Sequence, residues 1–192
     1  ASDFDNNSTN DVVLAKCGDD GYLPVRGREC SSEQMPFIAK KFENFEGYAA
    51  ASIDDIYGEG LDQALALEAK EFRSGVLENT PSGFVFHPFP TMAQISSVNA
   101  SLIDDFNHDG VLDVLIVGNH FDAEVETTRY DASNGLLLLG DGGLSYESQN
   151  ALYSGFYVPG NAKEMVQIEM ENGLKVIVVG NNNQQTSVFA WR

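Results

Sequence analysis

One stretch of the chain carries oxygen side chains at a spacing suited to a hard cation. The stretch reads DFNHDGVLD and spans residues 105–113, with Gly110 at its sixth position. Oxygen side chains occupy its first, third, fifth and ninth positions, namely Asp105, Asn107, Asp109 and Asp113. Calcium binds about six to eight oxygens in a flexible geometry, and alternate residues of a tight loop can converge on one point. We therefore predict a Ca²⁺ site, with the carbonyl of Val111 as a further ligand.

The residues around this loop separate it from an EF-hand. An EF-hand needs a bidentate glutamate at its twelfth position, where this chain has Ile116, and it needs flanking helices. The apolar runs on both sides of residues 105–113 predict strands instead. The competing interpretation is a polar hairpin turn in which Asp and Asn act only as turn formers.

A second stretch near the N-terminus, DFDNNSTND at residues 3–11, repeats the spacing. Its side-chain ligands would be Asp3, Asp5, Asn7 and Asp11, and Thr9 would offer its carbonyl. Ser8 replaces the glycine, so the turn requires a conformation that costs a non-glycine residue some energy. We expect a weaker calcium site. A third stretch, DDIYGEGLD at residues 54–62, has Ile56 and Gly58 at ligand positions and is predicted to begin a helix.

The overall charge narrows the possible partners. The chain has 192 residues, with 29 acidic and 11 basic side chains and a formal net charge of -18. Such a charge repels phosphate backbones and anionic membranes, so we expect no nucleic acid partner. A hydrophobic content of 43% still indicates a folded chain. No apolar run is long enough to predict a membrane span, and any secretion signal would have been removed or would lie upstream.

Repeated apolar strings and turn residues predict local antiparallel strands. VLIVGN at residues 114–119 and VIVVGN at residues 176–181 match closely, and VVLAKCG at residues 12–18 is a weaker echo. Glycine-rich turns predict hairpins. The hairpins and the final three-stranded meander cover residues 74–89, 135–147, 165–170, 174–179 and 187–191. Asn172 and Gly173 predict a type I′ turn in that meander.

Two segments favour helices and one favours a loop. Residues 31–42 begin with Ser31 and Gln34, which fit a capping box, and residues 52–70 present a short apolar face. The polar residues 120–134 predict a long loop. The aromatic side chains of Phe37, Phe42, Phe45 and Tyr48 are predicted to fill a core.

Two interpretations remain open for the cysteines, and two for the basic residues. Cys17 and Cys30 could close a hairpin with a disulfide in an oxidising compartment, or could stay free and buried. Arg26 and Arg28 could clamp an anion, although internal salt bridges are the preferred reading.

Motifs for common catalytic chemistry are missing from the sequence. We find no P-loop, no GxGxxG, no HExxH, no CxxC and no GxSxG. His87, His108 and His120 show no metal-ligand spacing, and His108 is predicted to face solvent. The chain is therefore predicted not to be an enzyme.

The acidic loops between strands resemble FG-GAP or VCBS repeats of integrin-like β-propellers. More closely, PVRGRECSSEQMPFI, DDIYGEGLD and RYDASNGLLLLGDG are similar to bacterial VCBS-repeat proteins related to the ASPIC/UnbV group. The resemblance implies calcium-binding propeller blades in exported proteins, with no assigned catalytic residues. Two departures matter, since Ser8 weakens the first loop and the last repeat lacks an acidic loop. The last repeat should therefore bind no metal.

We thus expect a mainly all-β fold of antiparallel propeller blades with short helical insertions. The blades would form one repeat-built segment over residues 1–192, with repeats near 1–48, 49–95, 96–154 and 155–192. A propeller usually has about four to eight blades, and the first repeat here lacks its preceding strand. The chain would then be part of a larger propeller, or its edges would pair with another copy.

The function expected from this reading is calcium-stabilised recognition or adhesion. The propeller would belong to a secreted or cell-surface protein and would bind an extracellular protein or glycan. One alternative is a propeller-class enzyme acting on glycans, which needs two acidic side chains about 5 to 10 Å apart in a pocket and not bound to metal. The other alternative is a subunit whose only task is assembly.

Overall fold

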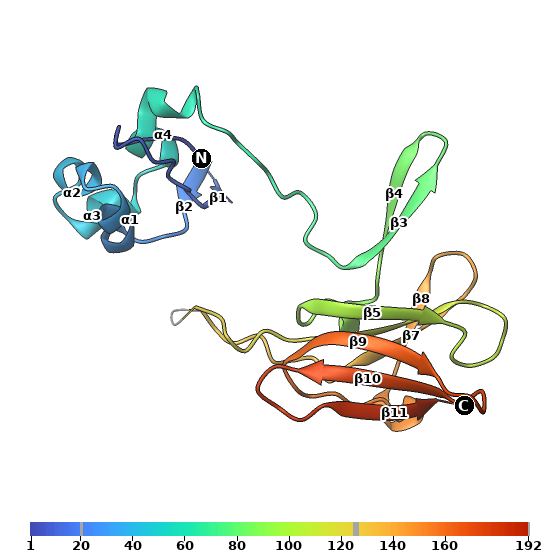
Figure 1. The fold of residues 1–192 in the computed structure, drawn as a ribbon. Helices are drawn as coiled ribbons and strands as arrows, with labels where there is room; N and C mark the ends of the chain where they lie inside the picture. The colour runs from blue at the N-terminus through green and yellow to red at the C-terminus, as the bar shows by residue number, and fades with distance from the viewer. Residues whose placement is uncertain (20, 125–126, 192) are drawn as a thin grey trace. The chain divides into compact units, whose positions relative to one another are not determined.

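The chain folds into two compact units that are mainly built of small antiparallel sheets. The structure is a computed structural model that describes residues 1–19, 21–124 and 127–191. Strands account for 35% of the residues and helices for 18%, which confirms the mainly β expectation. The units are Ala1–Lys70 and Glu71–Arg192 (Figure 1). The boundary between them falls inside the expected repeat 49–95, and the division into four repeats stays a prediction.

The first unit combines one hairpin with a group of short helices. Its elements are β1 (Ala15–Gly18), β2 (Gly21–Pro24), α1 (Arg28–Gln34), α2 (Phe37–Lys41), α3 (Phe45–Ala49), α4 (Ile53–Tyr57) and the 3-10 helix η1 (Gly58–Leu61). The core consists of Met35, Ile38, Tyr48, Ala51 and Ile56. Helices this short are marginal by themselves, so burial of these side chains must hold them in place.

The helix predictions for this unit are correct in type and wrong in detail. The capping box at Ser31 is wrong, because α1 begins at Arg28 and encloses Ser31. The buried hydroxyl of Ser31 accepts a hydrogen bond from the Tyr48 hydroxyl at 2.9 Å. The predicted helix over residues 52–70 keeps only α4 and η1, and residues 62–74 form neither helix nor strand. Gly58, with φ of 52°, ends α4.

One aromatic residue and Arg28 depart from the expectations for this unit. Phe37 and Phe42 pack against the core as predicted, but Phe45 is 62% exposed. The guanidinium of Arg28 lies 5.3 Å from the Phe45 ring centre. Arg28 donates hydrogen bonds to the carbonyls of Phe42 at 2.6 Å and Ala39 at 3.2 Å, so these contacts are helix-end carbonyls and not carboxylates.

Both cysteines are free thiols in the structure. Cys17 is exposed and Cys30 is partly buried, so neither the disulfide nor the fully buried reading describes them. Cys17 lies on β1, which pairs with β2 in an antiparallel hairpin, and Asp20 between the two strands lies outside the described residues.

The second unit contains a two-stranded, a four-stranded and a three-stranded sheet, all antiparallel. Its strands are β3 (Gly75–Thr80), β4 (Gly83–Pro88), β5 (Val98–Asp104), β6 (Asp113–Gly118), β7 (Leu136–Gly140), β8 (Tyr146–Gln149), β9 (Ala162–Glu169), β10 (Lys175–Asn181) and β11 (Ser187–Trp191). Two short helices, η2 (Thr91–Ala93) and α5 (Ala151–Ser154), lie between strands. The sheet orders are β3-β4, β5-β6-β7-β8 and β11-β10-β9, which confirms the predicted hairpins and the final meander.

The core of the second unit is organised around β6, which is buried at every position. Since successive side chains of a strand point to opposite faces, β6 contributes to two apolar layers. On one face Leu115 and Val117 join Ile177 and Val179 of β10 in the largest core cluster. On the other face Val114 and Ile116 pack with Ala93 and Leu138. The apolar run at residues 114–119 therefore serves both faces of the four-stranded sheet.

A buried asparagine at the end of β6 ties several loops together. Asn119 has no exposed surface, and its φ of 86° is rare for a residue other than glycine. Its side-chain oxygen accepts from the Ser96 hydroxyl at 2.8 Å and from the Ser133 amide at 3.0 Å. Its side-chain nitrogen donates to the carbonyls of Ser133 at 2.7 Å and Gly160 at 3.0 Å. Both the oxygen and the nitrogen of this side-chain amide thus form hydrogen bonds to neighbouring loops.

Two loop predictions meet different outcomes. Gly173 has φ of 77°, but Asn172 is not among the residues with positive φ, so the predicted type I′ turn is wrong. The amide of Gly173 instead donates to the carbonyl of Met170 at 2.8 Å. The predicted loop 120–134 contains no helix or strand in its described part, apart from a bridge between His120 and Tyr130, and residues 125 and 126 lie outside that part.

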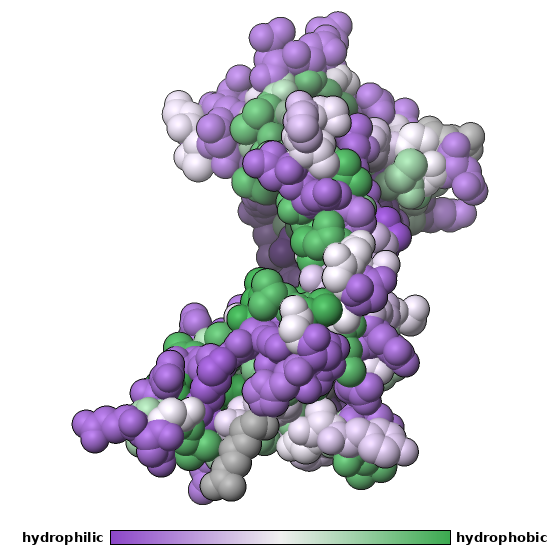
Figure 2. Space-filling model, turned by 90° about the vertical axis from the view of Figure 1, so that its right-hand side faces the viewer, coloured by the Kyte–Doolittle hydropathy of each residue, from purple (hydrophilic) through white to green (hydrophobic). Residues whose placement is uncertain are grey.

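Apolar side chains remain exposed beside the hairpin β3–β4. Leu77 of the hairpin and Ile103 of β5 are both more than 60% exposed, at 63% and 66%. An open cavity of about 870 Å³ is lined by residues from the hairpin and from the four-stranded sheet, including Phe86 and Ile116. Figure 2 shows apolar residues among hydrophilic ones on the surface that it displays.

Among the described residues, no helix has the length and apolar character needed to cross a bilayer.

Trypsin should cut the native chain first between its two units. The side chain of Lys70 is 79% exposed and Phe72 is 86% exposed, and residues 62–74 carry no regular structure. Exposed irregular segments are preferred sites of proteolysis. We expect cleavage after Lys70 to give two fragments that resist further digestion, as followed by mass spectrometry. Lys70→Gln should slow this step, and early cleavage within either unit would contradict the division.

Candidate metal centre

The loop at residues 105–113 is organised by its own carboxylates. It joins β5 to β6, so strands flank it on both sides as predicted. Asp105 accepts hydrogen bonds from the amides of Asp109 at 3.1 Å and Gly110 at 2.9 Å. Asp109 accepts from the amide of Val111 at 2.8 Å. His108 is exposed, as predicted.

The ninth residue of this loop, Asp113, is a fully buried carboxylate with two backbone donors. Its Oδ2 accepts from the amide of Phe106 at 3.0 Å, and its Oδ1 accepts from the amide of Gly140 at 2.9 Å. Gly140 ends β7, so Asp113 joins the acidic loop to the next hairpin of the sheet. A buried charge is tolerated only with such hydrogen bonds, because it has lost its contact with water.

The loop at residues 3–11 repeats this hydrogen-bond pattern. Asp3 accepts from the amides of Asn7 at 3.0 Å and Ser8 at 2.9 Å, the same loop positions that Asp105 engages. Asn7 accepts from the amide of Thr9 at 2.8 Å, as Asp109 does from Val111. Asp11 is 4% exposed and its Oδ2 accepts from the amide of Phe4 at 3.1 Å. The sequence repeat is therefore also a structural repeat.

The backbone conformations of the two loops also agree. In the first loop, at residues 3–11, Asn6 and Ser8 have φ of 60° and 70°. In the middle loop, at residues 105–113, His108 and Gly110 occupy the same positions and have φ of 61° and 89°. Ser8 thus adopts the conformation predicted to be unfavourable without glycine.

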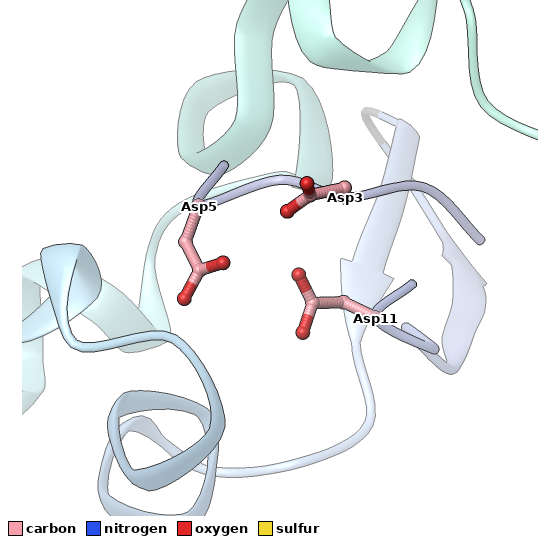
Figure 3. Close-up of side chains that lie close together, drawn as sticks. All are labelled: Asp3, Asp5 and Asp11. Atoms are coloured by element: carbon pink, nitrogen blue, oxygen red, sulfur yellow. The ribbon is translucent and has the colours of Figure 1, made fainter. Parts of the chain in front are cut away.

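Three carboxylates of the first loop gather around one space. Asp3, Asp5 and Asp11 each place an oxygen within 4.8 Å of the others, and Figure 3 shows the three carboxylates facing a common space. The Oδ1 atom of Asp5 is buried and has no hydrogen-bond partner. Carboxylate oxygens arranged in this way fit a hard cation such as Ca²⁺.

The middle loop brings fewer carboxylates together than its spacing predicts. Among the described residues, Asp3, Asp5 and Asp11 are the one group of three acidic, histidine or cysteine side chains at this separation. The middle loop has Asn107 where the first loop has Asp5. The amide of Asn107 donates to Asp109 at 2.8 Å and also accepts from the Asp109 amide at 3.0 Å. Asp105, Asn107 and Asp113 occupy the equivalent loop positions and would offer two carboxylates and an amide oxygen.

Aromatic and amide side chains that no sequence motif predicted at this site support the first loop. The Phe4 ring lies 4.5 Å from that of Tyr57, measured between ring centres. Burial raises the pKa of Tyr57, and Tyr48 and Asp11 raise it further, so the Tyr57 phenol stays protonated. Gln34 of α1 donates to Oδ1 of Asp11 at 3.1 Å. These partners come from helices distant in sequence, and no local motif signals them.

The middle loop has a different set of partners, taken from the C-terminal sheet. Lys175 of β10 forms a salt bridge with Asp104, which directly precedes the loop. Gln167 of β9 donates to the same carboxylate at 2.9 Å. The hydrogen bonds from Lys175 and Gln167 lower the pKa of Asp104 below its ordinary value of 3.8.

Comparisons of the chain with known protein families, with curated proteins and with solved structures found no match.

Replacing Ser8 by glycine should stabilise the first unit. A non-glycine residue in the left-handed region costs about 1 kcal/mol or more, and glycine removes most of this strain at the expense of a more flexible unfolded chain. We expect a gain of up to about 1 kcal/mol in the free energy of unfolding, measured by urea denaturation. Ser8→Ala retains the strain and should give no gain. Equal effects of the two substitutions would contradict the role assigned to φ.

The Asp104 salt bridge should make a contribution to stability that depends on pH. Because the folded state lowers the pKa of Asp104, its contribution is present above the ordinary value of 3.8 and is lost as pH falls through the lowered pKa. Asp104→Asn should therefore destabilise the chain at pH 7 and have a smaller effect at pH 3, as measured by urea denaturation. Lys175→Gln should show the same trend. An effect of Asp104→Asn that is equal at both pH values would contradict this account.

Proposed function

We propose that the chain is a calcium-binding, non-enzymatic β-propeller segment of a secreted or cell-surface protein. Calcium would stabilise the acidic loops, and the propeller would bind an extracellular protein or a glycan. One observation carries the proposal: the loops at residues 3–11 and 105–113 both have aspartate at their first and ninth positions and an aspartate or asparagine at their third and fifth, and they share the same hydrogen bonds and backbone conformations. Two turns that form only local hydrogen bonds need not place oxygen side chains at the same positions. Two sites for the same ion do need to.

Electrostatics supports an ion as the ligand. Each loop holds three aspartates within nine residues, in a chain with a net charge of -18. Neighbouring carboxylates repel one another, and a doubly charged cation removes that repulsion. Oxygen donors without sulfur or imidazole favour calcium over softer metals. The ligands would be Asp3, Asp5, Asn7 and Asp11 in one loop and Asp105, Asn107, Asp109 and Asp113 in the other, with the carbonyls of Thr9 and Val111.

The sheets of the second unit support the propeller part of the proposal. The sheet β5-β6-β7-β8 has four antiparallel strands in sequence order, which is the composition of a propeller blade. The sheet β9–β11 packs against one face of it through a shared core, as a neighbouring blade would. The resemblance of the acidic loops to FG-GAP and VCBS repeats agrees with this arrangement.

The exposed apolar residues support assembly with further sheets. Leu77, Ile103 and Leu112 are exposed, and the nearby cavity is lined by apolar side chains of the hairpin and the four-stranded sheet. Large exposed apolar patches mark interaction sites. The rest of a larger propeller or another copy of the chain would cover this face. Recognition of a protein or glycan would then be a property of the assembled propeller.

Calcium should raise the thermal stability of the chain, and an aspartate of the middle loop should be required for part of the gain. At a hundredfold excess over its dissociation constant, calcium at one site stabilises the folded state by about 2.7 kcal/mol. We expect the melting temperature in excess calcium to exceed that in chelator. Asp109→Ala should reduce the increase, and Asp5→Ala should reduce the part that arises in the first unit.

The matched control for this measurement is Asp62→Ala. Asp62 is an exposed aspartate of the stretch DDIYGEGLD, which has the wrong residues at the ligand positions. This variant should respond to calcium as the parent chain does. Melting curves that are identical in calcium and in chelator would exclude calcium as the stabilising ligand. Magnesium serves as the test of specificity, since it demands a more rigid octahedral geometry than these loops offer.

A further inference from the structure

The residue after the first aspartate of the middle loop contacts the last strand of the chain. Phe106 is 5% exposed and belongs to the core shared by the two larger sheets. Its carbonyl accepts a hydrogen bond from the indole nitrogen of Trp191 at 2.9 Å. The two rings meet edge to face, with 5.1 Å between their centres. The loop therefore provides a binding surface for β11.

A second set of contacts joins the residue before this loop to the other strands of that sheet. Asp104, which precedes Asp105, pairs with Lys175 of β10 and accepts from Gln167 of β9. Each strand of the sheet β9–β11 thus contacts Asp104 or Phe106, next to the proposed ligand Asp105. Phe106 also has its amide bonded to Asp113 at 3.0 Å, so the peptide groups on both sides of Phe106 are held.

We propose that calcium in the middle loop controls the docking of the C-terminal sheet β9–β11 onto the four-stranded sheet, through Phe106 and Asp104. This inference rests on the proposed calcium site. It adds a regulatory role to that site, because the ion would control the stability of the sheet β9–β11, which supplies none of its ligands.

Repulsion within the loop provides the physical basis of the coupling. Without an ion, the carboxylates of Asp105 and Asp109 have no cation between them and favour a wider loop. Widening displaces the carbonyl of Phe106, which is the acceptor for Trp191. Strand β11 pairs only with β10 among the described strands, so it opens more readily than β6 or β10 when this contact weakens. Calcium would offset this repulsion and favour the closed loop, in which the Phe106 carbonyl accepts from Trp191.

The chain contains an intrinsic fluorescent reporter for the docking of this sheet. Trp191 is the only tryptophan in the sequence, and it contacts Phe106 of the middle loop within its own unit. A calcium-dependent change in tryptophan emission should therefore report on the middle loop, whereas calorimetry detects calcium binding to either loop. This difference allows binding and coupling to be measured separately.

The experiment is a calcium titration of the full chain by calorimetry and tryptophan fluorescence, with hydrogen exchange of β11 at both end points. We expect emission to shift to shorter wavelength as Trp191 docks. If β11 opens only from the calcium-free form, its amide exchange should slow by about 100-fold at a hundredfold excess of calcium over the dissociation constant. Asp109→Ala should abolish both changes. Asp5→Ala, the matched control in the first loop, should leave them intact.

Trp191→Phe tests the indole contact without removing a calcium ligand. It keeps an aromatic ring against Phe106 but loses the donor to the Phe106 carbonyl. Calcium binding measured by calorimetry should persist, and the calcium-dependent protection of β11 should be smaller than in the parent chain. An unchanged protection of β11 in this variant would overturn the assigned route.

The outcomes separate this inference from the proposed function. Heat of binding that Asp109→Ala removes, with no change in emission or exchange of the parent chain, would overturn the coupling and leave the calcium site standing. No heat of binding in any variant would overturn the calcium site and the coupling with it. A change in emission that Asp5→Ala also removes would place the coupling in the first loop and overturn the present assignment.

Discussion

The hydrogen bonds accepted by Asp113 are the constraint on which the second unit depends. This carboxylate is fully buried, so both of its oxygens need donors, and they find them in the amides of Phe106 and Gly140. One donor belongs to the acidic loop and the other ends β7. The side chain therefore sets the positions of the loop and the next hairpin at the start of the most buried strand. Asp11 has the corresponding position in the first unit, where Phe4 and Gln34 are its donors.

The two acidic loops show how a binding geometry can be prepared by backbone groups. In each loop the first aspartate holds the amides of the fifth and sixth residues, and the ninth holds the amide of the second. Their surroundings differ, because Tyr57 packs on Phe4 whereas Trp191 packs on Phe106. A loop of the same geometry thus contacts helices in the first unit and a sheet in the second.

Much of this structure could be predicted from short-range patterns, and the errors have physical causes. Apolar runs and glycine turns predicted the strands of the second unit, because alternation and turn chemistry are local. The helix over residues 52–70 failed beyond η1, since helix propensity without a surface to pack on does not hold a helix together. Ligand spacing identified both loops but not the closer gathering of carboxylates in the first. The contact between Trp191 and Phe106 joins residues 85 positions apart, which no local pattern encodes.

Asn119 illustrates how sharply one position can restrict the choice of amino acid. Glycine would accept its φ of 86° but would provide none of the four side-chain hydrogen bonds to Ser96, Ser133 and Gly160. Aspartate has a similar shape, yet it would leave two carbonyls facing an acceptor instead of a donor. Leucine would match the size but neither the backbone nor the polarity. In any set of variants selected for folding, this site should tolerate the narrowest range of residues in its unit.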